Sequence, residues 1–261
     1  MPCTICGTNA DEPTVGTAGP DVICGLGGDD AIFAGGGDDR ICGGNGIDVS
    51  HGEGGNDTLV CESLGAHDTE DGGTGNDTIL CDENDGCIVD LAAGTCDEDM
   101  LQSIENAIGS SLGDTLSGNA GSNVLSGGGS ADTLNGRDGN DTLNGGTNND
   151  TLDGGNGADV LNCGGGNDTI SYLSSSTGVT ATLPGPLPGG DTSSGCENLT
   201  GSSFADNLTG DSGANTLSGA AGEDILNGAG GTDVCNGGPP GVLMGGEDIC
   251  VNCETETGCE G

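Results

Sequence analysis

Residues 109–171 divide without a gap into seven segments of nine residues. They read GSSLGDTLS, GNAGSNVLS, GGGSADTLN, GRDGNDTLN, GGTNNDTLD, GGNGADVLN and CGGGNDTIS. The sixth position is Asp in every segment except the second, which has Asn123, and the eighth position is always Leu or Ile. Abundant glycine does not explain a frame that persists through seven segments. The sequence therefore predicts a repetitive structure with a nine-residue unit.

The same unit recurs on both sides of this block. Residues 16–60 read GTAGPDVIC, GLGGDDAIF, AGGGDDRIC, GGNGIDVSH and GEGGNDTLV, and residues 72–80 read GGTGNDTIL. Residues 201–236 read GSSFADNLT, GDSGANTLS, GAAGEDILN and GAGGTDVCN. More than half of the chain is therefore built from one unit.

Two segments that interrupt the repeats resemble each other. GCIVDL (86–91) and GVTATL (178–183) are followed, after the same interval, by SIENAIGSSLGDTLSG (103–118) and GCENLTGSSFADNLTG (195–210). An internal duplication explains both pairs, and the alternating apolar residues predict short strands that widen or cap the repeat structure. A helix over DEDMLQSIENAI (97–108) is the weaker alternative.

The composition excludes several classes of partner. The 261 residues include 58 Gly and 43 Asp or Glu but only 2 Lys or Arg, so the formal net charge is −41. Nucleic acid and anionic membranes require clustered basic residues, and this chain offers just Arg40 and Arg137. No apolar run approaches the length of a membrane span, so membrane insertion is not expected either. The favoured counter-charge is a hard, oxygen-seeking metal ion, above all calcium.

The repeated unit resembles the calcium-binding nonapeptide of the RTX (hemolysin-type) family, G-G-x-G-x-D-x-U-x, in which U is a large apolar residue. It departs from this consensus at Ser50 and Cys235 in the eighth position and at Asn123 and Asn215 in the sixth. The resemblance implies an all-β fold, a right-handed parallel β-roll solenoid. Six residues form a turn and three a short strand, the strands fall alternately into two parallel sheets, and one coil takes eighteen residues.

The resemblance also implies the metal ligands. The carboxylate at the sixth position would meet backbone carbonyls of its own turn and of the turn one coil away, and such oxygen ligands suit calcium. Pairing carboxylates one coil apart gives about ten Ca²⁺ sites on this reading. The predicted ligands are Asp21, Asp30, Asp39, Asp48, Asp57, Asp77, Asp114, Asp132, Asp141, Asp150, Asp159, Asp168, Asp206, Asp224 and Asp233.

The apolar eighth position provides only one core side chain per nine residues. Each such side chain contributes about 1.5–3 kcal/mol when buried, whereas ordering the backbone costs about 1–2 kcal/mol per residue. Aromatic residues are 1% of the chain and Trp is absent. We therefore expect metal binding to supply the missing free energy, and the chain to be disordered without it.

The fourteen cysteines favour disulfides in an oxidising compartment over zinc. Zinc is the rival because Cys3-x2-Cys6 and Cys250-x2-Cys253 have ligand-like spacing, but neither has a second pair nearby. The eighteen-residue coil implied by the resemblance places Cys24 and Cys42 on adjacent strands, which predicts a disulfide between them. Further candidate pairs are Cys61–Cys81, Cys87–Cys96, and Cys235 with Cys250 or Cys253.

We divide the chain by these patterns. The expected parts are an N-terminal cap (1–15), a first β-roll block (16–80), a β insertion (81–108), a second block (109–171), a second β insertion (172–200), a third block (201–236) and a Cys-rich C-terminal cap (237–261). The cysteines near both ends predict disulfide-stapled ends.

We expect no enzymatic activity. Residues 109–113 match a G-x-S-x-G nucleophile signature around Ser111, but they lie inside a repeat and there is no H-E-x-x-H string. The expected function is a secreted or cell-surface calcium-dependent rod of an adhesin, surface layer or filament, with self-association through its ends. One alternative is the accessory domain of an exported protease, lipase or toxin, and a weaker one is an ice-binding module.

Overall fold

The computed structural model describes residues 2–62, 67–81, 86–238 and 249–259. The predicted insertion 81–108 and C-terminal cap 237–261 therefore lie partly outside the described residues. These residues contain no α-helix, and their one helical element is the 3-10 turn η1 (Pro188–Gly190). None of the described helical structure has the length and apolar character of a membrane span. The chain divides into two compact units, Met1–Gly128 and Gly129–Gly261.

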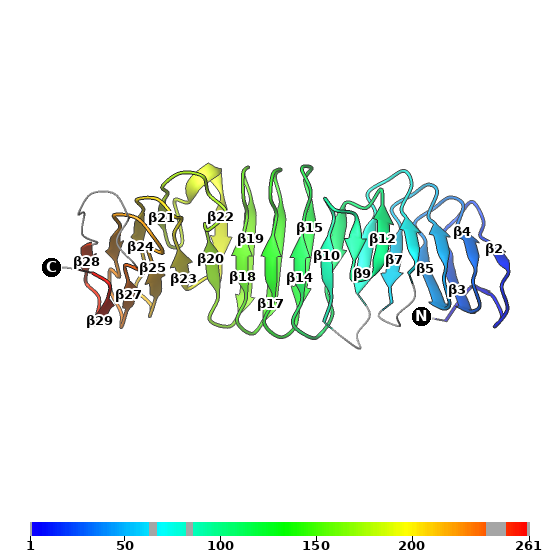
Figure 1. Cartoon of the computed structure of the whole chain (residues 1–261), viewed down its shortest axis with the longest axis horizontal. Coiled ribbons are helices and arrows are strands. Elements are labelled where there is room, and N and C mark those ends of the chain that lie inside the picture. Colours follow the sequence, from blue (N-terminus) through cyan, green and yellow to red (C-terminus); the bar gives the residue numbers. More distant parts are fainter. Residues whose placement is uncertain (1, 63–66, 82–85, 239–248, 260–261) are drawn as a thin grey trace. The chain divides into compact units, whose positions relative to one another are not determined.

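The N-terminal unit is a parallel β-solenoid with two sheets (Figure 1). One sheet has the order β1 (Ile5–Cys6), β3 (Val22–Gly27), β5 (Arg40–Asn45), β7 (Thr58–Cys61), β9 (Thr78–Cys81), β13 (Asn106–Ile108) and β15 (Val124–Gly128). The other has the order β2 (Pro13–Val15), β4 (Ala31–Phe33), β6 (Val49–His51), β8 (Thr69–Asp71), β12 (Asp99–Gln102), β11 (Thr95–Cys96), β10 (Ile88–Asp90) and β14 (Thr115–Ser117). Only β11 is antiparallel to its neighbours among the described strands of this unit.

The C-terminal unit is also a parallel β-solenoid, with strands in three sheets (Figure 1). The first contains β17 (Thr142–Thr147), β19 (Val160–Gly165) and β22 (Thr192–Ser194). The second contains β16 (Thr133–Asn135), β18 (Thr151–Asp153), β20 (Thr169–Ser171), β23 (Asn198–Thr200), β25 (Thr216–Ser218), β27 (Val234–Asn236) and β29 (Thr255–Thr257). The third contains β21 (Thr180–Thr182), β24 (Asn207–Thr209), β26 (Ile225–Asn227) and β28 (Ile249–Val251). The predicted parallel β-solenoid is confirmed, and the third sheet is an addition because β21 begins a new sheet within the second insertion.

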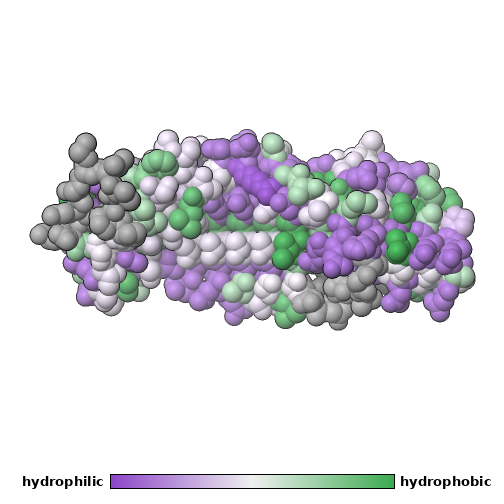
Figure 2. Space-filling model, in the orientation of Figure 1, coloured by the Kyte–Doolittle hydropathy of each residue, from purple (hydrophilic) through white to green (hydrophobic). Residues whose placement is uncertain are grey.

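The eighth position of each segment forms the core, as predicted. Parallel strands pair at a spacing of eighteen residues, for example Ile23 with Ile41 and Leu134 with Leu152, so equivalent side chains stack on one another. These four side chains are at most 1% exposed. The exposed large apolar residues include Ile225 and Ile249, which are register partners on β26 and β28, and hydrophilic residues cover much of the face seen in Figure 2. The interior is thus one narrow apolar column per sheet, with glycine-rich turns around it.

The solenoid continues across residues 61–71, where the repeat frame shifts. β6 pairs with β8 and β7 with β9 at a spacing of twenty residues, because this segment is eleven residues long. Asp68 takes the sixth position and Glu70 takes the eighth, between Ser50 of β6 and Leu101 of β12. The core column of this sheet therefore contains two consecutive polar residues, each 4% exposed.

The two insertions share one strand pairing. β10 pairs in parallel with β14 in the N-terminal unit, as β21 does with β24 in the C-terminal unit, at equivalent residues of the two copies. The alternative of a helix over residues 97–108 is wrong. Strands β12 and β13 lie in this segment, because neighbouring strands satisfy its backbone hydrogen bonds. Its side chains alternate between exposed and buried, as at Met100 and Leu101.

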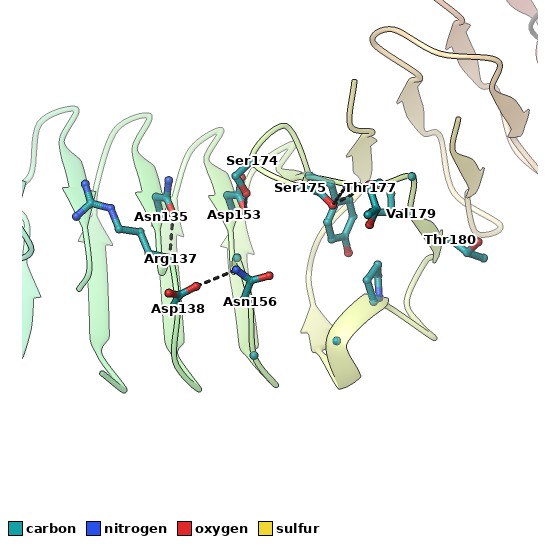
Figure 3. Close-up of a pocket in the computed structure, with 16 residues that line it drawn as sticks. Asn135, Arg137, Asp138, Asp153, Asn156, Ser174, Ser175, Thr177, Val179 and Thr180 are labelled. Carbon is teal, nitrogen blue, oxygen red and sulfur yellow. Dashed lines mark hydrogen bonds between the residues drawn. The ribbon is translucent and has the colours of Figure 1, made fainter. Parts of the chain in front are cut away.

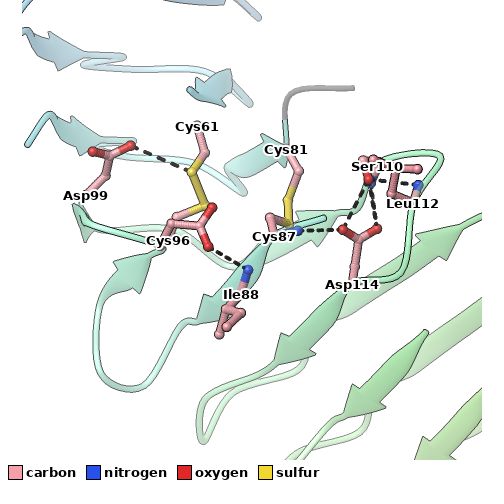
Figure 4. Close-up of a disulfide and its surroundings, with 10 residues drawn as sticks. Cys61, Cys81, Cys87, Ile88, Cys96, Asp99, Ser110, Leu112 and Asp114 are labelled. Atoms are coloured by element: carbon pink, nitrogen blue, oxygen red, sulfur yellow. Dashed lines mark hydrogen bonds between the residues drawn. A yellow bond between two sulfur atoms is a disulfide. The ribbon is translucent and has the colours of Figure 1, made fainter. Parts of the chain in front are cut away.

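Six disulfides are present among the described residues. They join Cys3–Cys24, Cys61–Cys96, Cys81–Cys87, Cys163–Cys196, Cys235–Cys253 and Cys250–Cys259. The second and third lie close together in the N-terminal unit (Figure 4). Both cysteines of the zinc-like Cys250-x2-Cys253 string are in disulfides, as is Cys3. Several bonds lie near the ends of the chain, as predicted.

The predicted Cys24–Cys42 disulfide is wrong, because Cys24 bonds to Cys3 and the Cys42 thiol donates to Glu62 Oε1 at 2.8 Å. The Cys61–Cys81 and Cys87–Cys96 pairs are wrong too. Cys24 with Cys42, and Cys61 with Cys81, are direct register partners on parallel strands. Side chains of direct register partners on parallel strands project side by side, so the short spacing between strands does not by itself bring two sulfur atoms into bonding geometry. Of the two partners considered for Cys235, Cys253 is correct.

Candidate calcium sites

The turns bring backbone and carboxylate oxygens together around the glycine at position 1. In the segment that begins at Gly145, a Cβ on this residue would lie 2.5 Å from Asp150 Oδ2 and 2.6 Å from the carbonyl oxygen of Cys163, one coil further on. Positions 2 and 4 turn the chain with left-handed backbone, for example Gly44 (φ 106°) and Gly46 (φ 135°). The Gly pattern is therefore explained by close approach at position 1 and by positive φ at positions 2 and 4.

One oxygen of each sixth-position carboxylate links two coils. Asp39 Oδ1 accepts a hydrogen bond from the backbone N–H of Asp21 at 2.8 Å, and Asp57 Oδ1 accepts one from Asp39 at 2.8 Å. We call each such series a carboxylate ladder. The same bond, 2.7–2.9 Å long, joins the pairs Asp30–Asp48, Asp48–Asp68, Asp57–Asp77, Asp132–Asp150, Asp141–Asp159, Asp150–Asp168 and Asp206–Asp224.

The second oxygen of most ladder carboxylates is buried and has no hydrogen-bond partner among the described residues. This holds for Oδ2 of Asp30, Asp39, Asp48, Asp57, Asp77, Asp150, Asp159, Asp168 and Asp233. A buried carboxylate oxygen without a donor is costly. These oxygens lie beside backbone carbonyls in the turns, and an all-oxygen donor set of this kind fits Ca²⁺.

The pKa values of these carboxylates also indicate that their charge is not compensated in the turns. Burial, reinforced by Asp77 and Asp39, raises the pKa of Asp57 to about 6 against the hydrogen bond from Asp39. Burial also raises the pKa of Asp39, Asp48, Asp150 and Asp159. The folded turn thus disfavours the charged form of these carboxylates unless a cation compensates them.

The comparison with protein families agrees with this geometry. The family model for the RTX calcium-binding nonapeptide repeat matches in four copies, at residues 15–50, 108–143, 136–170 and 200–235. The chain belongs to the RTX calcium-binding repeat family. It is a calcium-binding β-roll. No curated protein matches the chain.

A second class of RTX turn satisfies its own carboxylate. Asp21 Oδ2 accepts hydrogen bonds from the N–H and the Oγ1 of Thr17, both at 2.8 Å. Asp114 Oδ2 and Asp206 Oδ2 likewise accept from the N–H groups of Ser110 (2.7 Å) and Ser202 (2.6 Å). We call these closed turns, and each opens one of the three repeat blocks. Figure 4 shows the one around Asp114.

The side chain at position 2 separates the two classes. In closed turns it is Thr17, Ser110, Asn119, Ser202 or Asp211, and its oxygen also accepts the N–H two residues on. In turns with an unpartnered Oδ2, position 2 holds residues such as Gly44 or Leu26 at positive φ. The Thr17 bonds lower the pKa of Asp21, opposite to the direction at Asp39. Asp21, Asp114 and Asp206 are thus less suited to a cation than the other predicted ligands.

Asn123 and Asn215 belong to closed turns as well. Their Oδ1 atoms accept from the N–H groups of Asn119 (2.8 Å) and Asp211 (2.9 Å). Their Nδ2 groups donate to the carbonyl oxygens of Glu105 (2.6 Å) and Glu197 (2.7 Å). An amide is required there because one atom accepts and the other donates, so the departures from Asp have a structural reason.

Several ladder members were missed by sequence reasoning. Glu105 Oε2 accepts from Asp77 N–H at 2.8 Å, and Glu197 Oε2 accepts from Asp168 N–H at 2.9 Å. Asp191 accepts from Asp159 N–H at 2.8 Å. The Glu-Asn pair at equivalent places in the two duplicated segments is the signal that could have found Glu105 and Glu197. Asp191 follows no sequence frame.

A polar cavity of about 630 Å³ lies in the C-terminal unit (Figure 3). Arg137, Asp138, Asp153 and Tyr172 are among the residues that line it. Asn156 Nδ2 donates to Asp138 Oδ1 at 2.8 Å, and Ser174 Oγ donates to Asp153 Oδ1 at 2.9 Å. The described lining contains no histidine or cysteine, and its hydrogen bonds hold neighbouring coils and the second insertion together.

Proposed function

We propose that this protein is an extracellular structural module that becomes ordered when it binds several Ca²⁺ ions and that has no enzymatic activity of its own. The observation that carries the proposal is the series of buried Oδ2 atoms that have no hydrogen-bond donor among the residues the structure describes. With two basic residues against 43 acidic ones, the chain has almost no cations of its own to place there. Calcium therefore supplies both charge and coordination, and its binding free energy is folding free energy.

About ten ions is the number we propose. In the part of the chain that the structure describes, the nine carboxylates named above have an unpartnered Oδ2, whereas the closed turns at Asp21, Asp114 and Asp206 satisfy theirs. Ten Ca²⁺ would cancel about twenty charges and leave the chain near −21, so it would stay strongly acidic. Extracellular calcium sites commonly have dissociation constants of about 10⁻⁴–10⁻³ M, which matches millimolar external calcium.

The proposed location rests on the disulfides and the repeats. RTX repeats and disulfide bonds are typical of secreted proteins, and six disulfides join the described residues. We place the protein outside the cell, as the rod of an adhesin, surface layer or filament. Self-association would use the end strands of the solenoid, which offer open backbone edges. Electron microscopy with and without chelator tests this, since filaments should disappear when calcium is removed.

The runner-up function is the calcium-binding accessory domain of a secreted protease, lipase or toxin. RTX membership supports either function. The G-x-S-x-G string around Ser111 does not favour a hydrolase, because it leads into strand β14 instead of the helix that this signature needs. A catalytic domain encoded in the same gene would decide for the accessory role.

A calcium titration followed by circular dichroism tests the proposal. Calcium-free protein should lack β structure and gain it cooperatively at millimolar Ca²⁺. Mg²⁺ is the control ion, because it demands a small octahedral site and keeps its water, so it should be a poor substitute. Equal β content after exhaustive chelation would refute calcium-dependent folding.

A further inference from the structure

The core of the N-terminal unit contains a carboxylate where the repeat requires an apolar residue. Glu70 of β8 lies in register with Ser50 of β6 on one side and Leu101 of β12 on the other. Its side chain is 4% exposed, and its Oε2 atom is buried without a hydrogen-bond partner among the described residues. Two coils away, the equivalent position holds the fully buried Ile32.

Two further carboxylates converge on Glu70. One carboxylate oxygen from each of Asp68, Glu70 and Asp99 lies within 4.8 Å of the other two, and all three residues are buried. Asp68 Oδ1 accepts from Asp48 N–H at 2.8 Å, and Asp99 Oδ1 accepts from Asp68 N–H at 3.0 Å. These ladder bonds use one oxygen of each aspartate, and the other oxygen can serve as a ligand for a cation.

Among the described surroundings only His67 offers a positive charge, which lowers the pKa of Asp68 and of Asp99 against the larger effect of burial. Asp99 Oδ2 lies 3.7 Å from Cys61 Sγ (Figure 4), and a sulfur in a disulfide has no proton to donate. The one ion pair found among the described residues joins His51 to Asp71 and leaves the cluster out. His67 Nδ1 lies 3.2 Å from the carbonyl oxygen of Glu98. Burial, followed by the charges of Asp99 and Asp68, raises the pKa of Glu70 to about 9.

We propose that Asp68, Glu70 and Asp99 bind one Ca²⁺ ion inside the coil, at a site separate from the RTX turn sites. Three carboxylates form a hard, all-oxygen donor set that suits calcium and disfavours softer metals. The ion would join β8 to β12, two strands separated in sequence by β9, β10 and β11. It would thereby fix the first insertion to the irregular eleven-residue segment that the repeat frame does not specify.

Calcium stoichiometry of the full-length protein tests this site. Glu70→Gln keeps the shape of the side chain but removes its charge, and Glu70→Leu restores the apolar column. Native mass spectrometry at saturating Ca²⁺ should show one ion fewer in both variants. Glu98→Gln is the matched control, because Glu98 is exposed beside Asp99 and has the same charge change, and it should bind the full number. If both Glu70 variants keep the full number, Glu70 holds a proton and the site does not exist.

A second measurement does not depend on whether the variants fold. Crystals of the unchanged protein grown with Tb³⁺, which replaces Ca²⁺ at oxygen sites, should give an anomalous peak between the three carboxylates. Occupied turn sites without a peak at this place would overturn the interior site while leaving calcium-dependent folding intact. Absence of Tb³⁺ from the turns as well would instead contradict the proposed function.

Discussion

The two classes of turn predict different responses to the same substitution made one coil apart: a loss of calcium-dependent stability in one turn and no change in the other. Asp21→Asn and Asp39→Asn each remove one negative charge and one carboxylate oxygen. In Asp21→Asn the amide oxygen can keep both Thr17 bonds, each 2.8 Å long, so a calcium site is not affected. In Asp39→Asn the oxygen can keep the bond from Asp21 N–H, but an NH2 group replaces the buried, unpartnered Oδ2.

The size of the difference follows from calcium linkage. With a dissociation constant of about 10⁻⁴ M, about 10 mM free Ca²⁺ is 100 times that constant, and one site then stabilises the fold by about 2.7 kcal/mol. Asp39→Asn should lose about this much of the unfolding free energy at 10 mM Ca²⁺. The loss should shrink as the calcium concentration falls, because a bound ion then contributes less to stability. Without the ion, the negative charge of Asp39 does not stabilise the folded turn, since burial raises its pKa.

Urea unfolding at several calcium concentrations, followed by circular dichroism, measures both effects. Asp39→Asn should raise the calcium concentration at the folding midpoint, whereas Asp21→Asn should leave this midpoint unchanged. Equal midpoint shifts in the two variants would show that the hydrogen bonds of Thr17 do not distinguish closed turns from cation sites, and the reasoning would fail.

Three further predictions test the turns and their titration. Gly145→Ala should lower the calcium affinity several-fold, because the added Cβ meets Asp150 Oδ2 and the carbonyl oxygen of Cys163. In the control Gly165→Ala the added Cβ has no atom within 4 Å, so this variant should bind calcium normally in a calorimetric titration. Asn123→Asp should destabilise the protein by about 1–3 kcal/mol in thermal unfolding without adding an ion, because a carboxylate oxygen then faces the Glu105 carbonyl. For pH, burial raises the pKa of Asp57 and of Asp191 to about 6. Metal-free protein is therefore stabilised below pH 3.8 and loses this contribution as the pH rises through about 6, so circular dichroism of metal-stripped samples should show more structure at pH 4 than at pH 7. Stronger calcium binding at pH 5 than at pH 7 would contradict this sign, because protons and calcium compete for the same oxygens.

The local pattern predicted the solenoid because each repeat contains the residues that form its own turn and its own part of the core. Glycines at positions 2 and 4 permit the left-handed backbone of the turn, as at Gly44 and Gly46, and the apolar eighth position stacks eighteen residues on, as at Ile23 and Ile41. The distinction between closed and cation-binding turns is also written in the sequence, at position 2. Its meaning follows only from the structure, in which Thr17 and Ser110 donate hydrogen bonds to the carboxylate of their own turn.

The disulfides were beyond the sequence. Cys24 and Cys42 are neighbours in the repeat frame, but a bond depends on the direction of the Cα–Cβ vectors, which the frame does not describe. Cys3 approaches Cys24 from a terminal segment outside the frame, with a Cα–Cα distance of 6.1 Å.

The sequence by itself determined the repeat length, the strands, the core column and the carboxylates at the turns, because all of these depend on contacts between a residue and its equivalent in the next coil. Only the tertiary structure decided where the irregular segments go. The eleven-residue segment 61–71 and the insertion that follows place Asp68, Glu70 and Asp99 together although no period relates them. Their meeting is set by the parallel pairing of β8 with β12, a long-range contact that a local pattern does not encode.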